Sequence, residues 1–212
     1  MDLSYLLKYY KFFIEGTANT LMLSLISILI GLIIGIFLSL MKLSSKKVLK
    51  GIATAYIEFI RGTPLLVQLY MVYFGIKDIP MFLAGIIAIS LNSSAYIAEI
   101  IRAGIESIDK GQMEAARSLG LDYNTSMKEI IIPQAFKNIL PALGNEFIVL
   151  IKESAIASVI GVQDIMFKVD TIRGITYRPF SPLLVACLIY FTLTFTLSKL
   201  MGRLERRMKV SD

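Results

Sequence analysis

The apolar and charged positions divide the chain into long uncharged runs separated by short charged segments. Three runs contain no charged residue, at 16–41, 79–98 and 179–198. A helix needs about 20 apolar residues to cross the hydrocarbon core of a bilayer, and each of these runs is long enough. The pattern therefore predicts three membrane-spanning helices.

A fourth span is predicted around a shorter uncharged run, 62–76. Extending it to 51–77 makes it long enough to cross but includes Glu58 and Arg61, which lie on one helical face and can pair with each other. The Gly62-Thr63-Pro64 sequence predicts a break in the helix. We expect one long, kinked helix; an interfacial helix followed by a short span is the alternative.

The segment 134–161 is also long enough to cross, although it carries Lys137, Glu146, Lys152 and Glu153. Counting it, the sequence predicts an all-α membrane protein with a single transmembrane domain over 1–212. The five expected spans are 17–41, 51–77, 79–101, 134–161 and 180–201.

The distribution of lysine and arginine gives the expected orientation. With the N-terminus outside, about 14 basic residues fall on the cytoplasmic side against about 6 outside, as the positive-inside rule requires. An odd number of spans then places the C-terminus in the cytoplasm. The net charge of +6 follows from this topology, so it requires no nucleic-acid partner.

The remaining segments and residue types limit the chemistry. Residues 1–16 are expected to form an amphipathic helix at the outer interface, and 161–179 an outer loop with a short surface helix. The chain has no histidine and one cysteine, Cys187. These counts exclude a His- or Cys-based metal site and a serine–histidine or cysteine–histidine nucleophile pair.

The polar segment 109–132 lies between the third and fourth predicted spans and is expected in the cytoplasm. Strong helix formers end at Leu119, and Gly120 follows where a left-handed cap closes a helix. A second helix can begin at Asp122, or at Ser126, which fits a capping box with Glu129. This pattern predicts helix, tight turn, helix. A hairpin that only connects two spans is the simpler interpretation.

The spacing within this segment resembles the EAA motif of bacterial ABC-importer permeases. Glu114-Ala115-Ala116, Gly120, Ile130 and Pro133 match the family pattern, and Ile132 stands where the family has leucine. Residues 58–75 and 152–161 resemble the second and fourth spans of the polar amino-acid branch. The resemblance extends over 17–206.

The resemblance implies a type I ABC-importer fold in a bacterial cytoplasmic membrane. It implies that the segment 109–132 is a coupling helix unit that docks on a separate ATP-binding subunit. The chain lacks a G-x-x-x-x-G-K-[ST] phosphate loop, so ATP binding and hydrolysis are expected in that partner. The other expected partners are a second permease chain, identical or closely related, an extracytoplasmic amino-acid-binding protein, and lipid. The residues expected to contact the ATPase are Glu114, Ala115, Ala116, Arg117, Leu119 and Gly120.

Ionisable residues inside a span usually face a cavity or a partner, because they are costly in lipid. We therefore expect a substrate path, and the carboxylate of Glu153 favours a cationic amino acid, although glutamine or another neutral substrate stays open. Two other interpretations of the charges are a structural pair between Lys152 and Glu153 and an ATP-independent secondary transporter or small channel. The residues expected on the path are Lys152, Glu153, Ser154, Asn92, Ser93 and Ser94.

Overall fold

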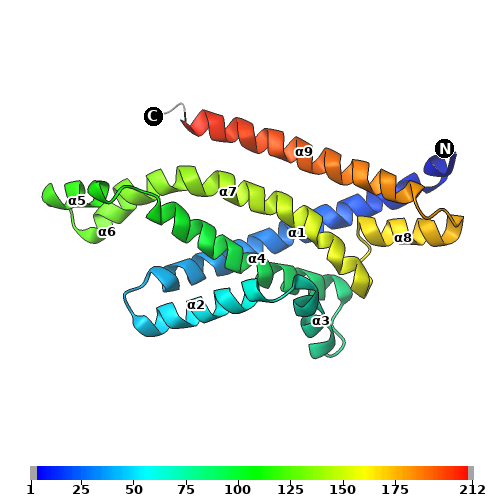
Figure 1. The fold of residues 1–212 in the computed structure, drawn as a ribbon, viewed down its shortest axis with the longest axis horizontal. Coiled ribbons are helices and arrows are strands. Elements are labelled where there is room, and N and C mark those ends of the chain that lie inside the picture. Colours follow the sequence, from blue (N-terminus) through cyan, green and yellow to red (C-terminus); the bar gives the residue numbers. More distant parts are fainter. Residues whose placement is uncertain (1–3, 210–212) are drawn as a thin grey trace.

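The computed structural model describes residues 4–209, with side chains from 7 to 208. Every element in this range is helical (Figure 1). The elements are α1 (Ser4–Leu43), α2 (Lys47–Gly62), α3 (Leu65–Gly75), α4 (Met81–Glu106), α5 (Lys110–Ser118), α6 (Tyr123–Ser126), the π-helical η1 (Met127–Ile131), α7 (Ile132–Glu153), the 3₁₀-helical η2 (Ser154–Ile160), α8 (Ile165–Thr176) and α9 (Ser181–Lys209).

The most extensive contact in the molecule joins α1 and α4. It depends on small residues, because they allow two helices to approach closely. A Cβ atom on Gly31 would lie 2.2 Å from the Ser93 hydroxyl oxygen, and one on Gly35 would lie 2.7 Å from Ile97. The Gly31–Gly35 repeat of the first span is therefore the face on which α4 packs.

The region 51–77 differs from the sequence expectation of a single kinked helix. It forms two helices, α2 and α3, with Thr63 and Pro64 in extended conformation between them. Figure 1 shows that α3 turns away from the direction of α2. Arg61 does not use the partner that the sequence offers it in Glu58, and pairs instead with Glu99 of α4.

The N-terminal part of the chain also differs from the expectation. Instead of a separate interfacial helix before the first span, α1 continues without a break from Ser4 to Leu43. At the other end of the molecule, α8 confirms the short helix expected within 161–179. It packs between α1 and α9, around a cluster that includes Phe13, Val169 and Ala186.

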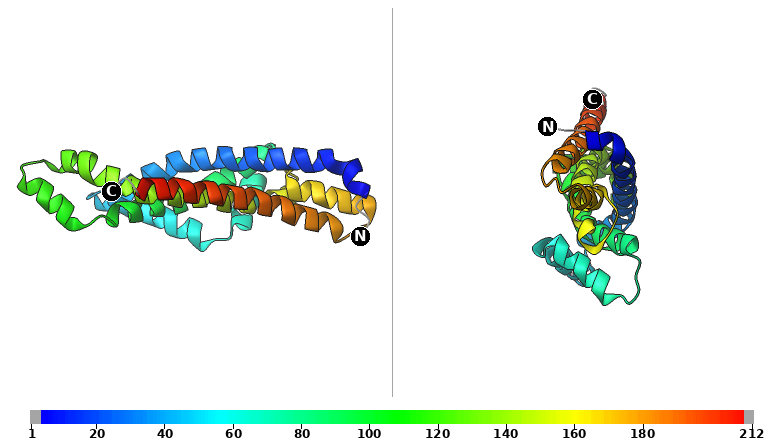
Figure 2. Two further views of the ribbon diagram at one scale, coloured as in Figure 1. Left: turned by 90° about the horizontal axis from the view of Figure 1, so that it is seen from above. Right: turned by 90° about the vertical axis from the view of Figure 1, so that its right-hand side faces the viewer.

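Within the part of the chain that the structure describes, three helices are long and apolar enough to cross a membrane, at 7–43, 81–106 and 181–208. The end-on view of Figure 2 places α2 and α3 on one side of the molecule and α9 on the other. The α5–α6 hairpin projects from one end, whereas the N-terminal end of α1 lies at the opposite end with α8 (Figure 1).

Candidate functional site

The hairpin is built by local hydrogen bonds that cap its helices. The Asp109 carboxylate accepts a hydrogen bond from the Gly111 amide at 2.6 Å and begins α5. At the other end, Gly120 has a φ of +86°, a value that a residue with a side chain rarely adopts. Its amide donates to the Arg117 carbonyl, and the Leu121 amide donates to the Ala116 carbonyl. These two bonds form a Schellman cap, which confirms the turn expected at Gly120.

The second helix of the hairpin begins at Asp122. The Asp122 side chain accepts from the Thr125 amide, and the Thr125 side chain and backbone amides around it hold the pKa of this carboxyl below its usual range. Ser126 is not a cap, because it lies inside the helix and donates its hydroxyl to the Asp122 carbonyl at 2.8 Å. The chain then continues through the π-helical turn η1 directly into α7.

The two alanines of the EAA sequence differ in their exposure to solvent. Ala115 is exposed, whereas Ala116 is 2% exposed and packs within the hairpin. Ala116 is therefore part of the hairpin's own packing, and Ala115 is the alanine that a partner can reach. The other expected contact residues are also on the surface, and the Leu119 side chain is 83% exposed. They are Glu114, Arg117, Leu119 and Gly120.

A groove of about 470 Å³ separates the hairpin from the end of α4. Apolar side chains line most of it, among them Ile105, Met113 and Met127. The hairpin therefore stands partly apart from the span before it.

The three consecutive polar residues of α4 are buried, and each meets a different helix. The Asn92 amide donates to the Gln68 side chain of α3 at 3.0 Å. Ser93 lies against Gly31 of α1, and Ser94 hydrogen-bonds the Tyr56 hydroxyl of α2 at 3.0 Å. These residues hold the helices around α4 together, so their hydrogen-bonding groups are engaged inside the chain.

The polar residues at the end of α7 are arranged differently. Lys152 and Glu153 are exposed, where the α-helix tightens into η2. Ser154 is buried and donates to the Ile151 carbonyl at 2.9 Å. The six residues expected to bind substrate therefore divide into two accessible charges and four buried hydroxyl or amide groups.

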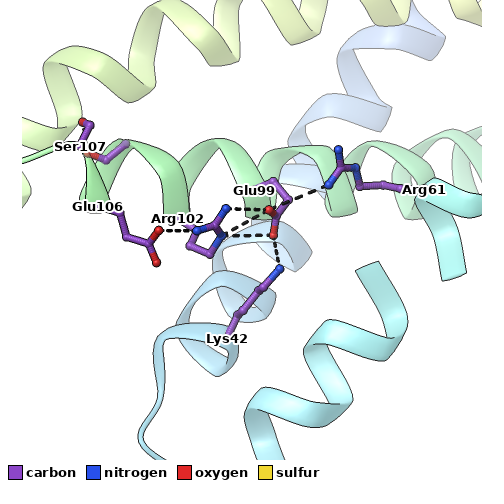
Figure 3. A network of polar contacts seen from close by, with 7 residues as sticks. Lys42, Arg61, Glu99, Arg102, Glu106 and Ser107 are labelled. Atoms are coloured by element: carbon purple, nitrogen blue, oxygen red, sulfur yellow. Dashed lines mark hydrogen bonds and ion pairs between the residues drawn. The ribbon is translucent and has the colours of Figure 1, made fainter. Parts of the chain in front are cut away.

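An ion-pair network joins α1, α2 and α4 near the hairpin end (Figure 3). Glu99 is at its centre: its carboxylate lies 2.5 Å from Lys42 Nζ, 3.0 Å from Arg102 and 3.9 Å from Arg61. Arg102 also pairs with Glu106, and the Arg61 guanidinium lies over the Tyr96 ring, 5.5 Å from its centre.

The hairpin and the helices behind it agree with the comparison to known families. Residues 16–210 match the profile of a protein family. That family is described as "Binding-protein-dependent transport system inner membrane component". The chain belongs to this family. Its fold is the all-helical fold of type I ABC-importer permeases.

Relatives of known name cover the whole chain. It is 46% identical to the arginine transport system permease protein ArtQ of Bacillus subtilis (strain 168), over 100% of this chain and 99% of that protein. It is 45% identical to the putative glutamine transport system permease protein GlnP of Rickettsia typhi, over 99% of this chain and 100% of that protein.

Solved structures give the same family and fold. A chain in the crystal structure of an amino acid ABC transporter with histidines matches with a TM-score of 0.94 and 53% identity, covering 98% of this chain and 99% of that one. A chain of the inward-facing MetNI methionine transporter matches with a TM-score of 0.76 at 17% identity, which shows the fold alone.

The residues of this permease that sequence reasoning missed are those that pair over long distances. Glu99 directly follows the uncharged run 79–98, inside the predicted span 79–101, and no partner was predicted for it. Gln68 lay within an apolar run without a visible partner. A signal was present in both cases, because a charged or amide side chain at the edge of or inside a span needs a partner.

Proposed function

We propose that the chain is the membrane-spanning subunit of an ATP-driven importer for polar amino acids, with a cationic amino acid as the preferred substrate. The observation that carries this proposal is the exposed, capped hairpin that bears the EAA sequence, in a chain that matches importer permeases along its whole length. The arginine and histidine in the names of similar proteins support the cationic substrate. The name of the Rickettsia relative supports glutamine as the alternative.

In this proposal the outer face of the hairpin docks on an ATP-binding subunit. Ala115 lets the partner surface come close, while Glu114 and Arg117 provide charges beside it. Leu119 adds an exposed apolar contact at the end of α5. Because the hairpin has its own caps, a movement of the partner is transmitted through η1 to α7 rather than lost in a flexible loop.

The chain crosses the membrane five times in this proposal. The crossings are α1, then α2 together with α3, then α4, then α7 together with η2, and finally α9. The N-terminus is outside and the C-terminus is cytoplasmic in the bacterial cytoplasmic membrane, so the hairpin faces the ATPase. The second permease chain, identical or related, completes a path that five crossings cannot enclose. An extracytoplasmic binding protein delivers the amino acid on the side of α8.

The substrate path of this proposal passes Glu153 and Lys152. Both charges are exposed in the single chain, so a second chain or a substrate can reach them. A carboxylate in a water-poor path attracts a cationic side chain. The four buried residues then hold the helices that line the path and do not contact the substrate. They are Asn92, Ser93, Ser94 and Ser154.

The test is uptake by the permease reconstituted in vesicles with its ATP-binding subunit and binding protein. We expect uptake of arginine that requires ATP and that fails when Ala115 is replaced by tryptophan, although the protein still inserts. Replacing Ala155 of η2, which lies outside the hairpin, by glycine is the control for a small-residue change. Uptake that continues without ATP would favour a secondary transporter or channel and would refute the proposal.

A further inference from the structure

Asp164 is a buried carboxyl group at the end of the molecule opposite the hairpin, where α1, α8 and α9 meet. It precedes α8 and caps it, because its Oδ1 atom accepts a hydrogen bond from the Phe167 amide at 2.9 Å. The whole residue is inaccessible to solvent. Its second oxygen, Oδ2, is also buried and has no hydrogen-bond partner among the residues that the structure describes.

The groups around Asp164 are hydroxyls from two other helices. The Thr20 hydroxyl of α1 accepts a hydrogen bond from the Ile165 amide at 3.2 Å. The Tyr190 hydroxyl of α9 lies within electrostatic reach of Thr20 and Asp164. It is buried as well, and within residues 7–208 it makes no well-formed hydrogen bond. Gly16 of α1 packs directly against the backbone of Asp164, since a Cβ atom on Gly16 would lie 3.0 Å from the Asp164 carbonyl oxygen.

The charged groups nearby do not neutralise Asp164. Asp170, on α8, has the same sign and disfavours ionisation. Lys168, also on α8, pairs with Glu15 of α1 at 2.9 Å and lies over the Phe12 ring. From α9 the facing titratable group is the Tyr190 hydroxyl. Burial, opposed in part by the backbone amides at the start of α8, raises the pKa of Asp164 to about 6.

We propose that Asp164 is a proton-binding site that holds α8 against α1 and α9. In the neutral form Oδ2 carries a proton taken from the solution and donates it in a hydrogen bond to the Tyr190 hydroxyl. Oδ1 continues to accept from the Phe167 amide, so both oxygens are satisfied. Loss of the proton leaves a buried carboxylate facing a hydroxyl, with no cation paired to it, and weakens the attachment of α8. This inference does not depend on the proposed transport function.

The sign of the pH effect follows from linkage. Because the pKa is higher in the folded protein than the ordinary 3.8, the folded state binds the proton more tightly than the unfolded state. The stabilisation is complete below about pH 4 and is lost as the pH rises through about 6. A neutral side chain at this position should therefore stabilise the protein at neutral pH and not at acid pH.

The experiment compares wild type with Asp164→Asn, as the purified full chain in lipid nanodiscs, by thermal unfolding from pH 4 to pH 7. Asparagine keeps the cap and cannot ionise. We expect the variant to melt higher than wild type at pH 7 by roughly 5 °C, and the difference to disappear by pH 4. Glu58→Gln, which changes an exposed carboxylate on α2 away from Asp164, is the control and should show no such pH-dependent gain.

A variant that melts at or below wild type throughout this range would overturn the proposal. Tyr190→Phe should melt below wild type by a larger margin at pH 4 than at pH 7. The reason is that it removes the hydroxyl that accepts the hydrogen bond from protonated Asp164. Wild type alone gives a further readout if Asp164→Asn does not fold. Hydrogen exchange of α8, corrected for its intrinsic pH dependence, should accelerate relative to that of α4 between pH 4 and pH 7. An unchanged ratio would also refute the proton site.

Discussion

Asn92, Ser93 and Ser94 occupy consecutive positions on one helix, so their side chains point in directions about 100° apart. This geometry explains why they contact three different neighbours, α3, α1 and α2 respectively. In a bilayer, small and hydroxyl-bearing residues allow close helix packing and hydrogen bonds between helices. A short polar run in the middle of a span therefore organises the helices around it.

Gln68 gives a prediction about stability. Its amide nitrogen donates to the Ile60 carbonyl and to Thr63 Oγ1, both at 2.8 Å, and its oxygen accepts from Asn92. Gln68→Leu leaves buried polar groups unpaired at the break between α2 and α3. We expect a loss of about 2 kcal/mol, measured by denaturant unfolding in micelles.

Two matched variants control this measurement. Gln163→Leu changes an exposed glutamine side chain and should have little effect. Adding Asn92→Leu to Gln68→Leu should recover part of the loss, because both partners of one bond are then apolar. A double variant as unstable as the sum of the two single ones would show that the Gln68–Asn92 bond is unimportant.

Glu153 gives a prediction about specificity, which rests on the proposed function. Glu153→Gln removes a charge and keeps the shape, so the permease should still assemble and stimulate ATP hydrolysis. We expect uptake of arginine to fall by roughly tenfold or more, since a hydrogen bond to a charged group contributes about 1.5–3 kcal/mol. Uptake of glutamine should change much less. The measurement is competition uptake in reconstituted vesicles.

Glu58→Gln, which changes an exposed carboxylate on α2, is the control for the loss of one negative charge. Equal losses for arginine and glutamine at Glu153 would indicate a gating or structural role. If neither changes, the substrate path lies elsewhere.

At the scale of elements, the hairpin depends on one backbone conformation. The positive φ of Gly120 allows the Schellman cap that ends α5. Gly120→Val should disrupt the turn, because a β-branched residue resists this conformation. We expect weaker binding of the ATP-binding subunit in a pull-down assay, with normal membrane insertion. Gly120→Asn should retain most binding, since asparagine tolerates the left-handed region. Equal binding by the two variants would contradict this role of the turn.

Element positions were predictable where the pattern was simple. The uncharged runs located α4 and α9 closely, and Gly120 located the end of α5, because both signals are local. The separation of α2 from α3 was only the alternative to the expected kinked helix. A proline after Thr63 indicates a break, but the size of the turn is fixed by the Gln68 side chain, which bonds across it. The sequence indicates that a Gln68 side chain inside a span needs a partner, but it does not identify that partner.

At the scale of the whole molecule, the proposed topology leads to a labelling prediction. The background is Cys187→Ser, because the native cysteine is exposed on α9. A cysteine replacing Lys46, between α1 and α2, should react with an impermeant reagent only from the cytoplasmic side. One replacing Asp170 on α8 should react only from outside. The reverse result would overturn the assigned orientation.

The candidate site was predictable only in part, for a physical reason. A sequence motif identifies a surface hairpin because its residues are close along the chain. The Glu99 network instead joins residues up to 64 positions apart, Lys42 to Glu106, and depends on how three helices cross. The burial of Ala116 and of the α4 polar residues depends on the same long-range packing.

The pairing of α1 with α4 has a consequence for how the protein is made. Leu43 leaves the ribosome 63 residues before Glu106, which is on the order of 3–13 s at about 5–20 residues per second. During that interval the small and hydroxyl-bearing face of α1 has no α4 to cover it. The nascent first helix must therefore wait, beside the insertion machinery or in lipid, until the helix that completes its packing has been synthesised.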